Sequence, residues 1–219
     1  MPDRVAIDGP AGSGKSTVAR KVAERLSYFY VDSGAFYRSV TYYFMKNNVD
    51  FKDDKQVGKA LEGMKIDVRS SDGEFVIYID GETYGEKIRT RDVTFNVSPV
   101  SALSSVRDKV NAFFRRLGRE HDIVMEGRDI GSVVLPEANY KIFLTASVEE
   151  RARRRMKELS EKGEKYSLEN IKKDIERRDH LDSTRDVAPL IKADDAIGID
   201  TTSMSIEQVI DHIIDIIKK

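Results

Sequence analysis

Only a few chain arrangements accommodate the segment Gly9-Pro10-Ala11-Gly12-Ser13-Gly14-Lys15-Ser16. It fits the pattern G-x-x-x-x-G-K-[ST] in full. It follows a short apolar run, residues 5–8, and precedes a stretch whose apolar residues recur at helical spacing. The sequence therefore predicts a strand, a glycine-rich loop and a helix in direct succession. In such a loop the backbone N–H groups can turn inward around phosphate oxygens.

Two side chains of this loop carry distinct chemistry. Lys15 can reach the β and γ phosphates of a nucleoside triphosphate, and the hydroxyl of Ser16 can ligate Mg²⁺. The alternative is a glycine turn that caps a helix and binds nothing. The full spacing, the strand–helix context and the lysine together favour the phosphate-binding interpretation.

The rest of the chain alternates strand and helix patterns. A second strand is expected near residues 28–31, where Asp32-Ser33-Gly34 can cap a helix from residue 35 to about 47. Further strands are expected at residues 123–125, 142–144 and 196–199, with amphipathic helices between them and after them. We therefore expect an α/β, three-layer P-loop fold with a central parallel sheet, and ligands at the carboxyl ends of its strands.

One stretch interrupts this alternation. Between residues 65 and 84 apolar and polar residues alternate, and Asp72-Gly73 and Asp80-Gly81 separate three strand-like runs. We interpret residues 62–98 as a small antiparallel insert of three strands on the acceptor side of the fold. The length of 219 residues suits a single domain, residues 1–219, that carries this insert.

Composition excludes several classes of protein. The chain has 37 Lys+Arg against 38 Asp+Glu, so bulk binding of nucleic acid or of an anionic membrane is not expected. It has no cysteine and 3 histidines, which argues against a disulfide framework or a zinc site. The N-terminus has no signal-peptide pattern and no apolar run is long enough to span a bilayer. We expect a cytoplasmic protein.

Two polar segments follow expected strands and are candidates for an acceptor site. Residues 32–38 can present Ser33, Tyr37 and Arg38 toward a cleft, although a helix cap with a surface arginine is the alternative. In residues 126–131, Arg128 suits a phosphate and Asp129 can accept from an exocyclic amino group. The alternative there is an Arg–Asp pair that only forms a salt bridge.

Arginines also gather on two later helices. Four of the residues 151–155 are arginine, and the alternative to phosphate binding is a solvated helix face paired with nearby glutamates. The next basic segment, residues 177–185, places Arg178 and Asp182 one helical turn apart. The stretch around Gly163, between the two helices, is expected to be the tip of a mobile helical lid at about residues 150–166. The sequence has no N/T-K-x-D motif for guanine, which argues against a GTPase. The clustered arginines favour a small-molecule kinase.

Taken together, these motifs resemble the bacterial cytidylate kinases, a branch of the nucleoside monophosphate kinase family of P-loop proteins. The resemblance rests on residues 9–17, 32–38, 127–131 and 185–190 and extends over essentially the whole chain. It implies Mg²⁺-dependent transfer of the γ-phosphoryl group of ATP to CMP or dCMP, which gives CDP or dCDP.

The resemblance also implies roles for individual residues. The ATP site would consist of Gly9, Pro10, Ala11, Gly12, Ser13, Gly14, Lys15, Ser16 and Thr17, with Arg151, Arg154 and Arg155 from the lid. Lys15, Arg128 and Arg185 would stabilise the transferring group, whereas the Mg²⁺ contact of Ser16 is expected from the loop motif and not from the resemblance. Ser33, Arg38, Arg128 and Arg185 would surround the CMP phosphate, Arg178 and Asp182 would hold the ribose, and Ser98, Arg107 and Asp129 would read the cytosine edge. Tyr37 is a further expected substrate-binding residue.

Two other functions stay open at this stage. One is a kinase for another small acceptor, such as UMP, AMP or shikimate. The other is a nucleotide-binding regulatory protein without turnover, which would be expected to lack Lys15 or the lid arginines. We expect CMP and dCMP as the small-molecule partners, no nucleic-acid or membrane partner, and a monomer.

Overall fold

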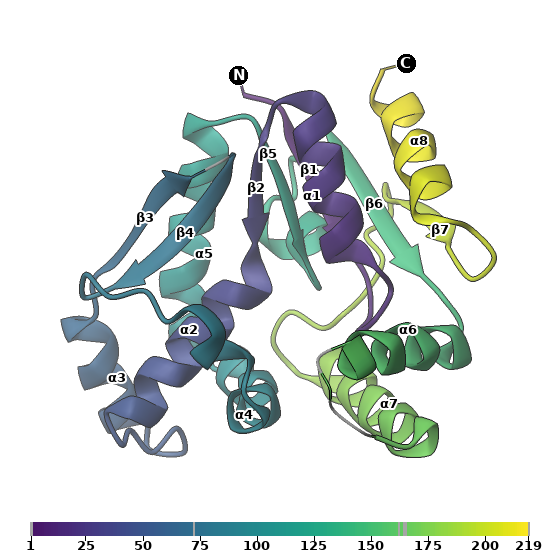
Figure 1. The fold of residues 1–219 in the computed structure, drawn as a ribbon. Coiled ribbons are helices and arrows are strands. Elements are labelled where there is room, and N and C mark those ends of the chain that lie inside the picture. Colours follow the sequence, from purple (N-terminus) through teal and green to yellow (C-terminus); the bar gives the residue numbers. More distant parts are fainter. Residues whose placement is uncertain (1, 72, 162, 164–165, 219) are drawn as a thin grey trace.

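The protein is built around a mixed β-sheet in a computed structural model that describes residues 2–71, 73–161, 163 and 166–218. The strands are β1 Arg4–Asp8, β2 Phe29–Asp32, β3 Ile66–Ser71, β4 Glu74–Ile79, β5 Ile123–Gly127, β6 Tyr140–Thr145 and β7 Ile197–Asp200. Within the described residues they form one seven-stranded sheet in the order β3-β4-β2-β5-β1-β6-β7 (Figure 1). All neighbouring pairs are parallel except β3 and β4.

Helices cover both faces of this sheet. They are α1 Lys15–Leu26, α2 Ser33–Lys46, α3 Asp54–Gly63, α4 Arg91–Ala102, α5 Ser104–Glu120, α6 Val148–Glu161, α7 Leu168–Thr184 and α8 Ile206–Ile217. Successive strand residues point to opposite faces, so Val5 and Ile7 pack with α1 and α8, whereas Ala6 packs in the cluster formed by α2 to α5. These three layers confirm the expected fold class. None of the helices in the described part of the chain has the length and apolarity needed to cross a bilayer.

The antiparallel insert is present, but the prediction of three strands was wrong. Strands β3 and β4 form a hairpin that extends the main sheet beyond β2, where Tyr30 pairs with Glu74. After the Asp80-Gly81 turn only an isolated bridge between Ile79 and Glu82 forms in the described residues. The chain then leaves the sheet because Tyr84 is buried, with its ring 4.8 Å from that of Tyr42 on α2. A 3₁₀ turn, η1 Gly85–Arg89, and most of α4 occupy the rest of the expected insert.

The two basic helices α6 and α7 pack against each other at the carboxyl end of the sheet (Figure 1). Their shared core is small and consists of Ala152, Ile171 and Ile175 with a few partly buried neighbours. The expected lid corresponds to α6 and the turn that follows it. Residues 162, 164 and 165 of the expected lid tip lie outside the described residues, and the motion of the lid stays a prediction.

Candidate active site

The phosphate loop joins β1 to α1 as the sequence predicts. Gly9 has φ 155°, and a side chain there would collide with the carbonyl oxygen of Leu144 on β6. Gly14, the N-cap of α1, adopts the left-handed conformation with φ 87°. Lys15 is buried, and its Nζ donates to Pro10 O at 3.2 Å, so the ammonium lies inside the loop. Ser16 and Thr17 are exposed at the start of α1.

A buried glutamate at the end of β5 supports this loop. Glu126 Oε1 accepts a hydrogen bond from Ser16 Oγ at 2.6 Å, and its Oε2 lies 3.9 Å from Lys15 Nζ. Burial raises the pKa of Glu126, whereas burial and the nearby Arg128 lower the pKa of Lys15. A hydroxyl beside a carboxylate is an oxygen donor set that suits Mg²⁺, so the residues present fit that ion.

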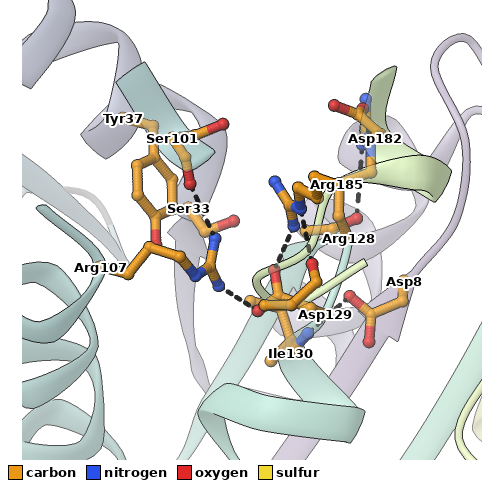
Figure 2. Close-up of polar contacts among 12 residues, drawn as sticks. Asp8, Ser33, Tyr37, Ser101, Arg107, Arg128, Asp129, Ile130, Asp182 and Arg185 are labelled. Atoms are coloured by element: carbon orange, nitrogen blue, oxygen red, sulfur yellow. Dashed lines mark hydrogen bonds and ion pairs between the residues drawn. The ribbon is translucent and has the colours of Figure 1, made fainter. Parts of the chain in front are cut away.

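On the acceptor side, a buried carboxylate lies between two arginines. Asp129 accepts from Arg185 at 3.2 Å and from Arg107, which approaches from the opposite side (Figure 2). Arg107 also donates to the Ser101 carbonyl at 3.2 Å, and its guanidinium carbon lies 5.5 Å from the ring centroid of Tyr37. The resemblance places Arg107 and Asp129 in one site, and the structure brings these two side chains into contact.

A second ion pair joins the end of β5 to α7. Arg128 Nε donates to Asp182 Oδ2 at 2.8 Å (Figure 2). Ser98 Oγ, on α4, donates to Asp182 Oδ1 at 3.4 Å. Burial acts to raise the pKa of Asp182, but Arg128 and Arg178 outweigh it and hold this pKa below its usual value. Asp182 therefore stays ionised, and its carboxylate contacts side chains from α4, the end of β5 and α7.

Two guanidinium groups near this cluster have incomplete hydrogen bonding among the described residues. The Nε atoms of Arg38 and Arg178 are buried and have no hydrogen-bond acceptor among the described residues. Arg38 pairs with Asp32 only through its NH2, at 3.2 Å, and Arg178 Nε is 4.0 Å from Asp182. Burial and repulsion from Arg128 lower the pKa of Arg178 to about 10. An anion placed here would satisfy both donors, since buried polar groups in native proteins normally have partners.

Two expected acceptor residues use their hydroxyls within the protein. Ser33 Oγ donates to the Glu126 carbonyl at 2.6 Å, and a side chain on the adjacent Gly127 would clash with it. Tyr37 is 7% exposed, and its hydroxyl donates to Asn111 Oδ1 at 3.2 Å. Both residues support the floor of the site, and Tyr37 does so from the hydrophobic core.

The lid arginines divide into two groups. Arg151 is buried and donates to Ala11 O at 2.9 Å and to Asp179 at 2.5 Å. Arg154 donates to Ser13 O at 3.3 Å and to Thr201 O at 2.7 Å. Arg151 and Arg154 therefore hold α6 against the phosphate loop. Arg155 pairs with Glu158 at 2.7 Å on the exposed face of α6, the arrangement of the alternative interpretation.

Some residues of the site were missed from the sequence. Asp8, the last residue of β1, is buried and accepts from the backbone N–H groups of Ile130 and Gly131, each at 2.8 Å. It thereby fixes the turn that follows Asp129, a single π-helical turn η2 Ile130–Val134 (Figure 2). The sequence signal that could have identified Asp8 is a carboxylate at the end of an apolar strand. The role of Asp179, which also accepts from Ala11 N at 3.3 Å, had no such signal.

Comparison with known proteins gives a consistent result. A sequence model of the family described as cytidylate kinase matches residues 5–219. The cytidylate kinase of Lactobacillus johnsonii is 48% identical over 99% of this chain and 94% of that protein. The cytidylate kinase of Shouchella clausii is 48% identical over 98% of this chain and 96% of that protein. A solved structure of an uncharacterized protein from Eubacterium ventriosum, 13% identical with a TM-score of 0.54 over 99% of each chain, shares the fold.

Proposed function

Because the chain belongs to the cytidylate kinase family and phosphorylates CMP and dCMP with ATP, we propose that the clustered arginines described above form its acceptor site. In this proposal ATP lies on the phosphate loop, residues 9–17. The phosphate of CMP lies against Arg38, Arg128 and Arg185, and its ribose lies against Arg178 and Asp182. The cytosine edge faces Ser98, Arg107 and Asp129.

One observation carries this assignment. The buried Nε atoms of Arg38 on α2 and Arg178 on α7 have no acceptor among the described residues, and burial together with the charges of Arg128 and Arg38 lowers the pKa of Arg178. An unsatisfied buried guanidinium is costly unless a ligand completes it. A nucleoside monophosphate supplies phosphate and ribose oxygens in one molecule, so it can serve both groups.

The donor site can also hold Mg²⁺. In our proposal Ser16 binds the ion directly, and Glu126 orients that hydroxyl or a water molecule of the ion. When bound, Mg²⁺ neutralises charge on the ATP phosphates. Of the three lid arginines in the expected ATP set, Arg151 and Arg154 act by holding α6 over the loop, and a contact of Arg155 with ATP stays a prediction.

The chain's own residues then act in two ways, by alignment and by charge stabilisation. The phosphate loop and the acceptor arginines bring two anions into line, which removes most of the entropic cost of their encounter. The ammonium of Lys15 offsets negative charge on the transferring phosphoryl group in the transition state. Arg128 and Arg185 are further cations on the acceptor side. A CMP phosphate oxygen forms the new bond to the γ phosphorus as the bond to the bridging oxygen of ADP breaks. That oxygen is ionised near neutral pH, so no side chain has to act as a general base.

A coupled assay of ADP release tests the acceptor. Purified protein with ATP and Mg²⁺ is offered CMP, dCMP, UMP, AMP and shikimate in parallel. We expect rapid turnover with CMP and dCMP and at most slow turnover with the others. Efficient turnover of another acceptor would overturn the assignment of Ser98, Arg107 and Asp129 to cytosine. A cytoplasmic location, a monomeric state and the division into one domain with an insert and a lid stay predictions.

A further inference from the structure

An exposed phenylalanine on the acceptor side of the protein contacts helix α7. Phe95, on α4, is 59% exposed, the largest exposed fraction among the large apolar side chains of the described residues. The guanidinium carbon of Arg177, on α7, lies 4.9 Å from the centroid of its ring. A guanidinium over an aromatic face at this distance is a cation–π contact. Phe95 is thus held by a residue from the opposite wall of the site.

The position of this contact relates it to the acceptor site. On α4, Ser98 lies three residues after Phe95, on the same side of the helix, and donates to Asp182 of α7. On α7, Arg177 immediately precedes Arg178, which we assign to the ribose. The two helices therefore meet through an inner polar contact and an outer aromatic contact. Both helices lie at the carboxyl end of the sheet (Figure 1).

The strength of the outer contact suits a reversible closure. At an exposed site a cation–π pair changes an equilibrium by only about two- to fivefold, and a desolvated pair by about thirtyfold. A contact of this kind opens readily to admit a ligand and strengthens when closure removes water from the ring. The apolar burial of Phe95 is too small to explain the position of this ring as ordinary core packing.

We propose that Phe95 and Arg177 form a gate over the acceptor site, a contact between α4 and α7 that retains the bound nucleoside monophosphate during transfer. This inference rests on the proposed function, because it takes the acceptor to lie between these two helices. Both are positioning residues, since they touch each other and not the reacting atoms. Closure of the gate depends on the charge of Arg177 and on the π face of Phe95.

Steady-state kinetics with both substrates varied provide the first test. Phe95→Leu keeps apolar bulk and removes the π face, and Arg177→Met keeps the stem and removes the charge. We expect each to raise KM for CMP by between about threefold and thirtyfold, with KM for ATP changed less than twofold. The double variant should be no worse than either single variant, because all three lack the same contact. Phe95→Trp keeps a π face and Arg177→Lys keeps a positive charge, so both variants should have a KM for CMP close to that of the wild type.

A matched control exists within the insert. Arg69 lies 4.3 Å from the ring centroid of Tyr78, on the β3–β4 hairpin, so Arg69→Met removes a similar contact elsewhere. We expect it to leave both KM values unchanged. Unchanged KM for CMP in Phe95→Leu and Arg177→Met, or additive effects in the double variant, would overturn the gate. If wild-type protein fails to phosphorylate CMP, the proposed function fails instead, so the two failures are distinguishable.

A spectroscopic readout tests the gate without turnover. The chain has no tryptophan, so Phe95→Trp introduces a single indole at the contact. We expect CMP alone to change the emission of this indole, and the change to disappear when Arg177→Met is added. Identical spectra with and without CMP, in a variant that binds CMP normally by calorimetry, would contradict the gate. Phe95 is exposed, so these variants are expected to fold, and circular dichroism melting confirms it.

Discussion

Glu126 Oε2 lies 3.9 Å from Lys15 Nζ, and both side chains are buried. Glu126 also accepts from Ser16, and it immediately precedes the Gly127-Arg128 pair that opens the acceptor site. One carboxylate therefore adjoins the two halves of the site. Burial and the charge of Arg128 lower the pKa of Lys15 from 10.5 to about 7, so its charge depends on what occupies the loop.

Binding of ATP should therefore be accompanied by proton uptake. At about pH 8 a large fraction of Lys15 is neutral in the free protein, because its pKa is lowered. The triphosphate brings negative charge to Nζ, which raises the pKa again and favours the ammonium. Calorimetry at this pH in buffers of different ionisation enthalpy should give binding enthalpies that differ between buffers. In Lys15→Met the difference should vanish; a buffer-independent enthalpy in the wild type would contradict the account.

The buried carboxylate of Asp8 should make folding stability depend on pH. Burial raises its pKa from 3.8 to about 7, although the N–H groups of Gly131 and Ile130 act in the opposite direction. The folded state then binds a proton that the unfolded state has lost. This contribution to the free energy of unfolding is present below about pH 4 and is lost as the pH rises to about 7. The shift corresponds to at most about 4 kcal/mol.

Asp8→Asn provides the control for this prediction, because an amide does not titrate. Urea unfolding of both proteins at about pH 4.5 and pH 7.5 gives the difference in unfolding free energy between them. We expect the wild type to lose stability relative to Asp8→Asn as the pH rises. An equal difference at both pH values would show that Asp8 does not titrate in this range. At every pH the amide leaves one backbone N–H poorly paired, at a cost of about 1–3 kcal/mol.

Arg38 should contribute to CMP binding and little to stability. Its Nε has no partner among the described residues, and its ion-pair partner Asp32 is retained as the N-cap of α2 by Ala35 N at 2.7 Å. Charge-assisted hydrogen bonds contribute about 1.5–3 kcal/mol, so Arg38→Met should raise KM for CMP at least about tenfold. Initial rates at saturating ATP measure this. As a control, Arg25→Met changes an exposed arginine that pairs with Asp211 and Glu207, and it should leave KM for CMP unchanged. Equal KM values for wild type and Arg38→Met would show that Arg38 does not belong to the acceptor site.

The fold and the donor side of the site could be predicted closely from the sequence. Local signals suffice there, because the loop motif, the strand runs and the cap at Asp32 each act within a few residues. The third strand of the insert was predicted wrongly because the burial of Tyr84 against α2 is a tertiary contact. That contact draws the chain out of the sheet, although the turn signal at residues 80 and 81 is genuine.

On the acceptor side the sequence indicated the participants but not their partners. The pairing of Asp129 with both Arg107 and Arg185 joins three segments that are distant in the chain. The same holds for the contact of Arg151 with Asp179. A run of charged residues on a helix does not reveal which of its side chains is buried. The sequence therefore could not distinguish the buried Arg151 from Arg155, which pairs with Glu158.

Calorimetric titration of CMP into wild type and Asp129→Asn tests most directly whether CMP binds where Asp129 lies between Arg107 and Arg185. The amide keeps the shape of the carboxylate and loses its charge, and circular dichroism confirms that the variant is folded. We predict that CMP binds at least about tenfold more weakly to Asp129→Asn, with the affinity for ATP changed less than about twofold. Unchanged CMP affinity in the folded variant would contradict the account.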